Sequence, residues 1–293
     1  MKISLRYRWL LQGVLWSAPF IAGCSLFPHA SSTPNERSDK ESNAGMPGKY
    51  SIRVSQFVFL SDVEIRREQP IFKDLSNLRE QVYRELRLPP ANTEVFVYLF
   101  EDKDRYEKFM KAKHPELPPR RAFFVAQPRR LGGVEDLMVY TYMGERIHQD
   151  LRHELTHALL HSVLKNVPIW LDEGLAEYFE VASGQGSVNP QHLEALRQAG
   201  VRFDLDRLER LEEVHQMTPA EYRESWAWVH LMLRSTPQAR QALLGYVQDL
   251  RINPNPSPLR PRLAPAFLSL EQALQTHLID MERKLPRNAT AKQ

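Results

Sequence analysis

The 293-residue sequence has a single cysteine, Cys24, and little excess charge of either sign. One cysteine excludes an internal disulfide scaffold, because no second thiol exists in the chain to pair with it. The 39 Lys and Arg are nearly balanced by 36 Asp and Glu, and Lys2, Arg6 and Arg8 all precede residue 24. Without those three, the sequence carries 36 residues of each sign. Nucleic-acid binders concentrate basic residues against phosphates, so we expect no nucleic-acid partner.

The first 23 residues have the pattern of a bacterial signal peptide. Basic residues precede an apolar segment, Trp9–Ala22, which is shorter than the roughly 20 apolar residues that a membrane-spanning helix needs. The segment leads through Gly23 into Cys24, which resembles the lipobox of lipoproteins. This resemblance implies that residues 1–23 are removed and that Cys24 is lipidated. An ordinary secretory signal, which would yield a soluble periplasmic protein, is the alternative.

The position after the cysteine and the segment that follows predict where the folded part is held. Ser25, rather than Asp, follows Cys24, which in lipoproteins implies retention in the outer membrane, facing the periplasm. Residues 24–49 contain few apolar side chains, so they cannot bury enough surface to fold. We therefore expect a flexible linker that tethers the folded part to the membrane of the cell envelope.

The remaining sequence predicts an α+β fold with a small mixed sheet followed by helices. We expect an α/β sheet subdomain at 50–145, a mainly helical subdomain at 146–285 and a C-terminal tail at 286–293. Apolar alternation predicts strands, and apolar residues at three- and four-residue spacing predict helices. The predicted strands are 50–65, 93–100, 121–126 and 137–142. The predicted helices are 71–88, 102–113, 146–164, 168–182, 190–198, 219–234, 238–250 and 270–284, and the proline-rich stretch 253–265 is expected to be a loop.

The segment His153-Glu154-Leu155-Thr156-His157 matches the HExxH pattern inside a predicted helix. Histidines four residues apart project from one face of a helix, so both imidazoles can bind one ion while Glu154 flanks it. This arrangement predicts Zn²⁺ as the cofactor, with His153 and His157 as ligands. Glu154 is then the general base that takes a proton from water.

Zinc in a hydrolase usually has three protein ligands, so a third ligand is required. The longer metzincin pattern is absent, because Leu160 and Val163 occupy its Gly and His positions. His161 is not a suitable ligand, because eight helical residues place it about 12 Å from His153 along the axis. The next predicted helix carries Glu173 and, one turn later, Glu177. Two acids on an otherwise apolar helix face favour a cation nearby.

The HELTH segment, followed by WLDEGLAEYFE at 170–180, resembles the gluzincin clan of metallopeptidases, which includes thermolysin. The resemblance spans residues 50 to about 234 and implies a zincin-like fold whose metal site lies at the HExxH helix. It implies that Glu173 is the third zinc ligand and that Glu177 orients a ligand histidine. Glu173 follows His157 by 16 positions, a shorter spacing than in thermolysin-like enzymes, so the connection must be tight. A metal-free relative, whose acids pair with Arg152 or Arg146, is the alternative.

The resemblance also implies where a peptide substrate is held. The strand 137–142, just before the HExxH helix, corresponds to the edge strand that binds an extended substrate in the clan. Tyr222 and His230 are candidate donors to the oxyanion of the reaction, because they lie on one face of a predicted helix; ordinary aromatic packing is the alternative. Glu135 follows Gly132 and Gly133 in a segment similar to the element that binds the amino end in aminopeptidases, although a simple turn also explains the glycines.

Together these features predict a lipid-anchored periplasmic zinc peptidase that acts on a peptide or protein substrate in the cell envelope. One alternative is a non-catalytic envelope lipoprotein that keeps the zincin fold as a binding or scaffold module. Another is a hydrolase of a non-peptide amide, such as one in cell-wall material.

Overall fold

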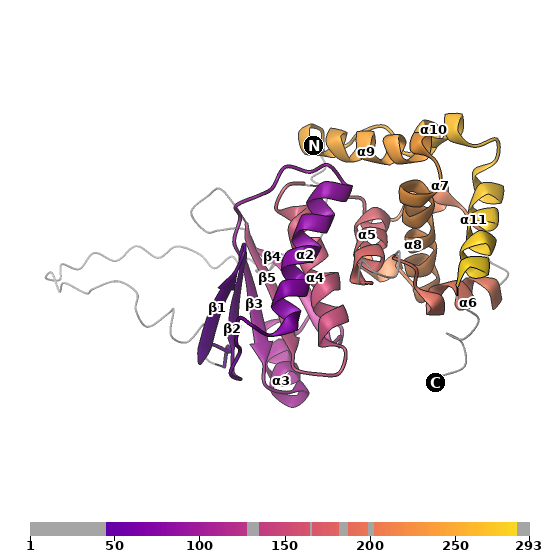
Figure 1. Cartoon of the computed structure of the whole chain (residues 1–293). Helices are drawn as coiled ribbons and strands as arrows, with labels where there is room; N and C mark the ends of the chain where they lie inside the picture. The colour runs from indigo at the N-terminus through magenta and orange to yellow at the C-terminus, as the bar shows by residue number, and fades with distance from the viewer. Residues whose placement is uncertain (1–44, 128–134, 165, 182–186, 199–201, 286–293) are drawn as a thin grey trace, which may run out of the picture.

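The computed structural model describes residues 45–127, 135–164, 166–181, 187–198 and 202–285. It shows an α+β protein with a five-stranded mixed sheet and a mostly helical remainder, which confirms the predicted class (Figure 1). Cys24, the predicted signal peptide and most of the predicted linker lie outside the described residues, as do Gly132 and Gly133.

The sheet has the order β1-β2-β3-β5-β4. Its three inner strands β2, β3 and β5 are parallel to one another, whereas β1 and β4 pair antiparallel at the two edges. The bounds of the strands are β1 (Tyr50–Val54), β2 (Phe57–Ser61), β3 (Val95–Phe100), β4 (Ala122–Gln127) and β5 (Asp136–Tyr142).

Two predictions about the strands are wrong. The segment 50–65 is not one strand but the hairpin β1–β2, which turns at Ser55, whose φ of 57° lies in the left-handed region. The strand 137–142 is not an edge: β5 lies between β3 and β4, and β4 is the edge strand on that side. The segments AFFVAQ of β4 and LMVYTY of β5 are both nearly continuous apolar runs, so the sequence does not show which of them is the edge strand.

The side chains of β3 alternate between two apolar clusters, one on each face of the sheet. Val95 and Val97 face the core shared with α2 (Pro70–Glu85) and α4 (Ile147–His161), whereas Phe100 faces α3 (Lys103–Lys113) with Tyr106. Because side chains in a strand alternate between faces, β3 buries apolar groups on both sides. Figure 1 shows α2 and α4 together on one face of the sheet. This layer places the HExxH helix directly against β4 and β5.

The other helices pack beyond α4, in the order α5, α8 and α11 away from the sheet, with α9 crossing one end (Figure 1). Their bounds, with those of two single-turn 3₁₀ segments, are α5 (Ile169–Glu180), α6 (Pro190–Gln198), α7 (Leu205–Glu209), η2 (Val214–Gln216), α8 (Pro219–Arg234), α9 (Pro237–Ile252), α10 (Arg260–Leu263), η3 (Ala264–Ala266) and α11 (Leu270–Lys284). The predicted bounds of α6, α8 and α11 are confirmed. The proline-rich stretch is not only loop, since α10 and part of η3 lie in it.

The α5–α8 contact depends on Gly174, the glycine after Glu173. A Cβ atom at this position would lie 2.7 Å from the carbonyl oxygen of Ser225 and 3.0 Å from Cγ2 of Val229. Both distances are too short for a side chain, so a residue without Cβ is needed where the two helix backbones approach each other. This contact holds α5, and with it Glu173, between α4 and α8.

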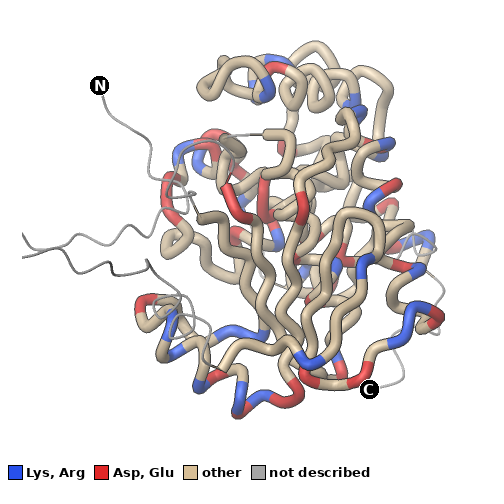
Figure 2. The backbone as a smooth tube through the Cα atoms, turned by 90° about the vertical axis from the view of Figure 1, so that its left-hand side faces the viewer, with Lys and Arg blue, Asp and Glu red and all other residues tan. Residues whose placement is uncertain are grey.

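Charged residues of both signs lie in the helices and loops around the sheet, while the strands carry few of them (Figure 2). Among the described residues, no helix has the length and apolar character to cross a membrane.

Candidate metal centre

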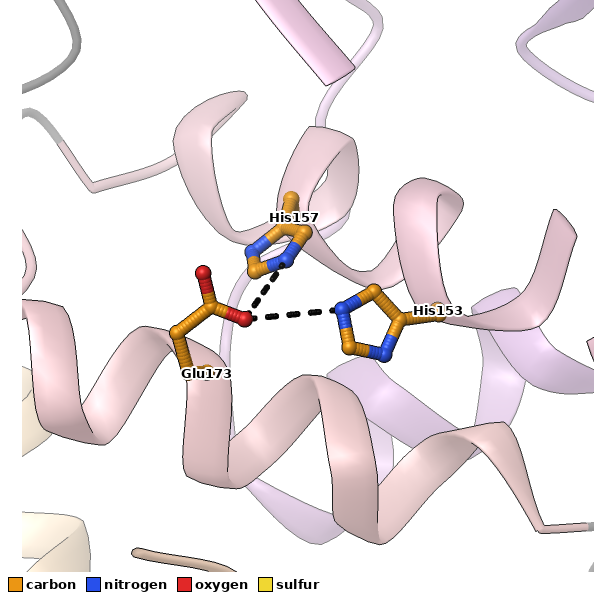
Figure 3. A group of neighbouring side chains, drawn as sticks. All are labelled: His153, His157 and Glu173. Atoms are coloured by element: carbon orange, nitrogen blue, oxygen red, sulfur yellow. Dashed lines mark ion pairs between the residues drawn. The ribbon is translucent and has the colours of Figure 1, made fainter. Parts of the chain in front are cut away.

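The centre is built on α4, where His153 and His157 project from the same side of the helix toward α5 (Figure 3). Their ring centroids are 5.0 Å apart. The rest of the helix is anchored by buried apolar residues, among them Leu151, Leu155 and Leu159. The two imidazoles therefore extend from a rigid, packed element rather than from a loop, as the HExxH spacing predicts.

Glu173 of α5 meets both histidines with one oxygen. Its Oε2 lies 3.5 Å from Nε2 of His153 and 3.6 Å from Nε2 of His157. These distances are long for a charge-assisted hydrogen bond. They match two donors that each lie about 2.1 Å from a tetrahedral zinc ion, which are about 3.4 Å apart. These two imidazole nitrogens and one carboxylate oxygen form a group that could hold a metal ion, and they are donors that zinc accepts.

Asp172, which precedes Glu173, holds the far side of His157. Its Oδ1 lies 3.0 Å from Nδ1 of His157, and its Oδ2 lies 3.0 Å from Nε2 of His161. Burial alone would raise the pKa of Asp172, but the charges of the two histidines and the hydrogen bond with His161 lower it to about 2. A carboxylate on the second nitrogen of a ligand histidine fixes its tautomer and ring orientation. The structure thus gives His161 a position beside the centre, next to Asp172.

The residue that holds His153 in the same way is Glu180, whose Oε2 lies 3.2 Å from Nδ1 of His153. The resemblance assigned this role to Glu177, but the hydrogen-bond partner of Glu177 is Nε2 of His192, at 2.7 Å. Glu177, Glu180 and His153 nevertheless form a second group of possible metal donors within 4.8 Å of one another. Because Glu180 follows Glu173 by seven residues, two helical turns, the spacing alone places both on one face. That signal was available in the sequence.

Burial and mutual pairing shift the pKa values of the donors in the metal-free protein. Burial would lower the pKa of His157, but Asp172 and Glu173 outweigh it and raise this pKa to about 10. Burial would raise the pKa of Glu173, but the charges of the two nearby histidines lower it well below its usual range. A metal ion binds neutral imidazoles, so its binding at this group would displace protons from the histidines.

Glu154, the predicted general base, follows His153 on α4 and is half-buried. Burial raises its pKa, while the nearby His153 and His157 oppose this shift. A raised pKa makes this carboxylate a stronger base, which suits a group that accepts a proton from water.

Tyr222 and Arg120 meet beside this centre from the two halves of the chain. Tyr222, in the first turns of α8, accepts a hydrogen bond from Nη2 of Arg120 at 3.1 Å. Burial raises the pKa of Tyr222 to about 12, with Glu173 as the next cause. Its phenol therefore stays protonated and can donate a hydrogen bond. Arg120 lies two residues before the edge strand β4, and no motif in the sequence singled it out.

His230, the other candidate donor, has different surroundings. Its Nδ1 lies 2.9 Å from Nε2 of His277 on α11, and its ring packs against Tyr178 and Trp226. It follows Tyr222 by eight residues, about 12 Å along the helix axis. These contacts match the alternative of aromatic packing.

Glu135, the residue similar to the amino-end binding element, is exposed just before β5.

The two arginines that the metal-free alternative pairs with the acids have other partners. Arg152 pairs with Asp74 at 2.9 Å and donates to the carbonyl oxygens of Phe179 and Glu180, at the end of α5. Arg146 donates to Gln149. Arg152 therefore secures the C-terminal end of α5 and leaves the carboxylate of Glu173 to the histidines.

No protein-family model matches the chain, and no curated protein matches it either.

Proposed function

We propose that the protein is a zinc-dependent hydrolase, specifically a zincin-like peptidase of gluzincin type, anchored by lipidated Cys24 in the cell envelope. The observation that supports it best is the convergence of His153, His157 and Glu173 at distances suited to one tetrahedral ion. The antiparallel edge strand β4 beside the HExxH helix supports the substrate assignment.

Zinc held by these residues would supply Lewis-acid activation of water and of the substrate carbonyl group. Glu154 accepts the proton from the attacking water and passes it to the leaving amine, which its raised pKa favours. Tyr222 donates its phenolic hydrogen to the oxygen on which negative charge develops. Asp172 and Glu180 keep the two histidines in fixed orientations.

The substrate is proposed to be an extended peptide that adds to the outer edge of β4. In the described sheet, β4 pairs with β5 on one side only. Addition of a strand uses backbone hydrogen bonds, so it accepts many sequences. Phe124 of β4 contacts the rings of His157 and His161, with centroids 6.1 and 5.3 Å apart, so this edge lies over the HExxH helix.

The test is the zinc content of the purified full-length protein by elemental analysis, for wild type, Glu173→Ala and the control Glu154→Gln. We expect about one zinc per chain in wild type and in Glu154→Gln, and a large loss in Glu173→Ala. Glu154→Gln should then lower cleavage of a peptide library, followed by mass spectrometry, by at least about 100-fold.

The same measurements separate the alternatives. Absence of zinc from wild type after incubation with the ion would overturn the proposal in favour of a non-catalytic scaffold. Zinc binding without cleavage of any peptide would overturn the peptidase assignment, and hydrolysis of cell-wall amides would then identify the other hydrolase.

A further inference from the structure

Arg120 differs from its neighbour Arg121 in what it binds. Arg121 forms a close ion pair with Asp150 at 2.6 Å. Arg120 donates to the neutral phenol of Tyr222 and lies over the ring of Phe123 at 6.0 Å. Within the part of the chain that the structure describes, no carboxylate is within ion-pair distance of Arg120. A guanidinium has five N–H donors, so most of its hydrogen-bonding capacity is available to a ligand.

The charge of Arg120 nevertheless reaches the centre. Arg120 lies four residues before Phe124 of β4, and the ring of Phe124 stacks on that of His157. The side chain of Arg120 is exposed, so a ligand can approach it from solvent. Arg120 thus places a positive charge at the accessible border of the proposed active site, between the sheet half and α8.

Arg120 lies just before β4, so its charge affects the direction in which a peptide binds along this strand. Strand β4 starts at Ala122, two residues after Arg120. A peptide paired antiparallel to β4 has its C-terminal end at the start of β4, beside Arg120. A peptide in the parallel direction would place its positively charged amino end there, next to a like charge. The arginine therefore favours the antiparallel direction.

The candidate metal centre lies beside the first half of β4. Arg121 is level with Asp150, one turn before His153, whereas Phe124 is level with His157. Residues of an extended chain advance about 3.3 Å each, so only about two or three residues of a bound peptide would span the distance from Arg120 to the centre.

We propose that Arg120 binds the C-terminal carboxylate of the substrate, so that the protein removes one to three residues from the free C-terminus of peptides. This inference rests on the proposed peptidase function. It names the substrate class of that site: peptides with a free carboxylate close to the scissile bond. Arginine suits this role because its planar fork matches a carboxylate with two parallel hydrogen bonds.

The test measures peptide binding by calorimetry to the zinc-loaded full-length Glu154→Gln protein, in which hydrolysis is blocked. Three probes are compared: acetyl-tetra-alanine with a free carboxylate, the same peptide as its amide, and an amide whose last residue is Asp. We expect the free carboxylate to bind about tenfold or more tightly than either amide. Addition of Arg120→Gln should abolish the difference, whereas the control Arg121→Gln should keep it.

Other outcomes overturn the inference. Equal binding of the acid and the plain amide, or an equal loss for both in Arg120→Gln, would assign Arg120 only to positioning Tyr222. Binding of the Asp amide as tight as that of the free acid would show that any nearby carboxylate suffices and would remove the C-terminal specificity. Zinc content, measured on the same samples, separates these failures from failure of the metal centre itself.

Discussion

Asp172 is a residue whose importance comes from two contacts rather than from a motif. It is fully buried and lies between His157 and His161, with 3.0 Å to each. Its low pKa of about 2 means that it is ionised throughout the neutral range, where it pairs with both rings. Removal of that charge should loosen the orientation of His157.

We therefore predict that Asp172→Asn lowers zinc affinity by about 10- to 100-fold, measured by competition with a chelator. His161→Gln, which changes the other partner of Asp172, should lower the affinity less, because His157 keeps its carboxylate. An unchanged affinity in Asp172→Asn would show that packing alone orients His157.

The same residues determine how metal binding depends on pH. In the metal-free protein the pKa of His157 is about 10 and that of His153 is well above its usual value, so both rings are protonated at pH 7. Zinc binds the neutral rings, so uptake must release protons, and affinity should rise with pH. Calorimetry in buffers of different ionisation enthalpy should show release of one to two protons per zinc at pH 7. Release of no protons would contradict the ion-paired metal-free state.

At the scale of helices and strands, the contact between α5 and α8 has the most direct consequence for the stability of the protein. The Cβ atom of any residue at position 174 would overlap the carbonyl group of Ser225. Gly245 on α9 offers a matched control, because nothing lies within 4 Å of the corresponding Cβ position.

We predict that Gly174→Ala lowers the free energy of unfolding by about 1–3 kcal/mol, because the backbones must move apart to admit the methyl group. Since α5 carries Glu173, zinc content should fall as well. Gly245→Ala should leave the stability unchanged or raise it by up to about 1 kcal/mol, since alanine is the better helix residue. Urea denaturation of both variants measures the difference. Equal effects at the two sites would mean that α5 and α8 are not in close contact.

For the whole molecule, the predicted lipid anchor determines location independently of the folded part. Cys24 is the only cysteine in the chain and follows the apolar segment after Gly23. We predict that Cys24→Ala moves the protein from the membrane fraction to the soluble fraction in cell fractionation, without change in its zinc content. A variant that stays in the membrane fraction would contradict lipidation.

Much of the centre could be predicted from local patterns. The HExxH spacing places two histidines on one helix face because the helical period is independent of the rest of the fold. Helices such as α6, α8 and α11 were predicted with their bounds because their apolar residues recur regularly and their ends carry proline or capping residues, such as Ser269 before α11. The sequence alone thus determined the α+β class and the helical placement of His153, Glu154, His157 and Glu173.

Only the tertiary structure decided the relations between segments that are distant in the chain. The edge position of β4 follows from strand order, which no apolar run encodes. Arg120 and Tyr222, which form a hydrogen bond, are 102 positions apart in the sequence. His230 differs from Tyr222 because it contacts His277 of α11. Side-chain periodicity is a property of one element, whereas pairing and contact between elements depend on packing of the whole chain, and this packing selects which polar residues surround the metal centre.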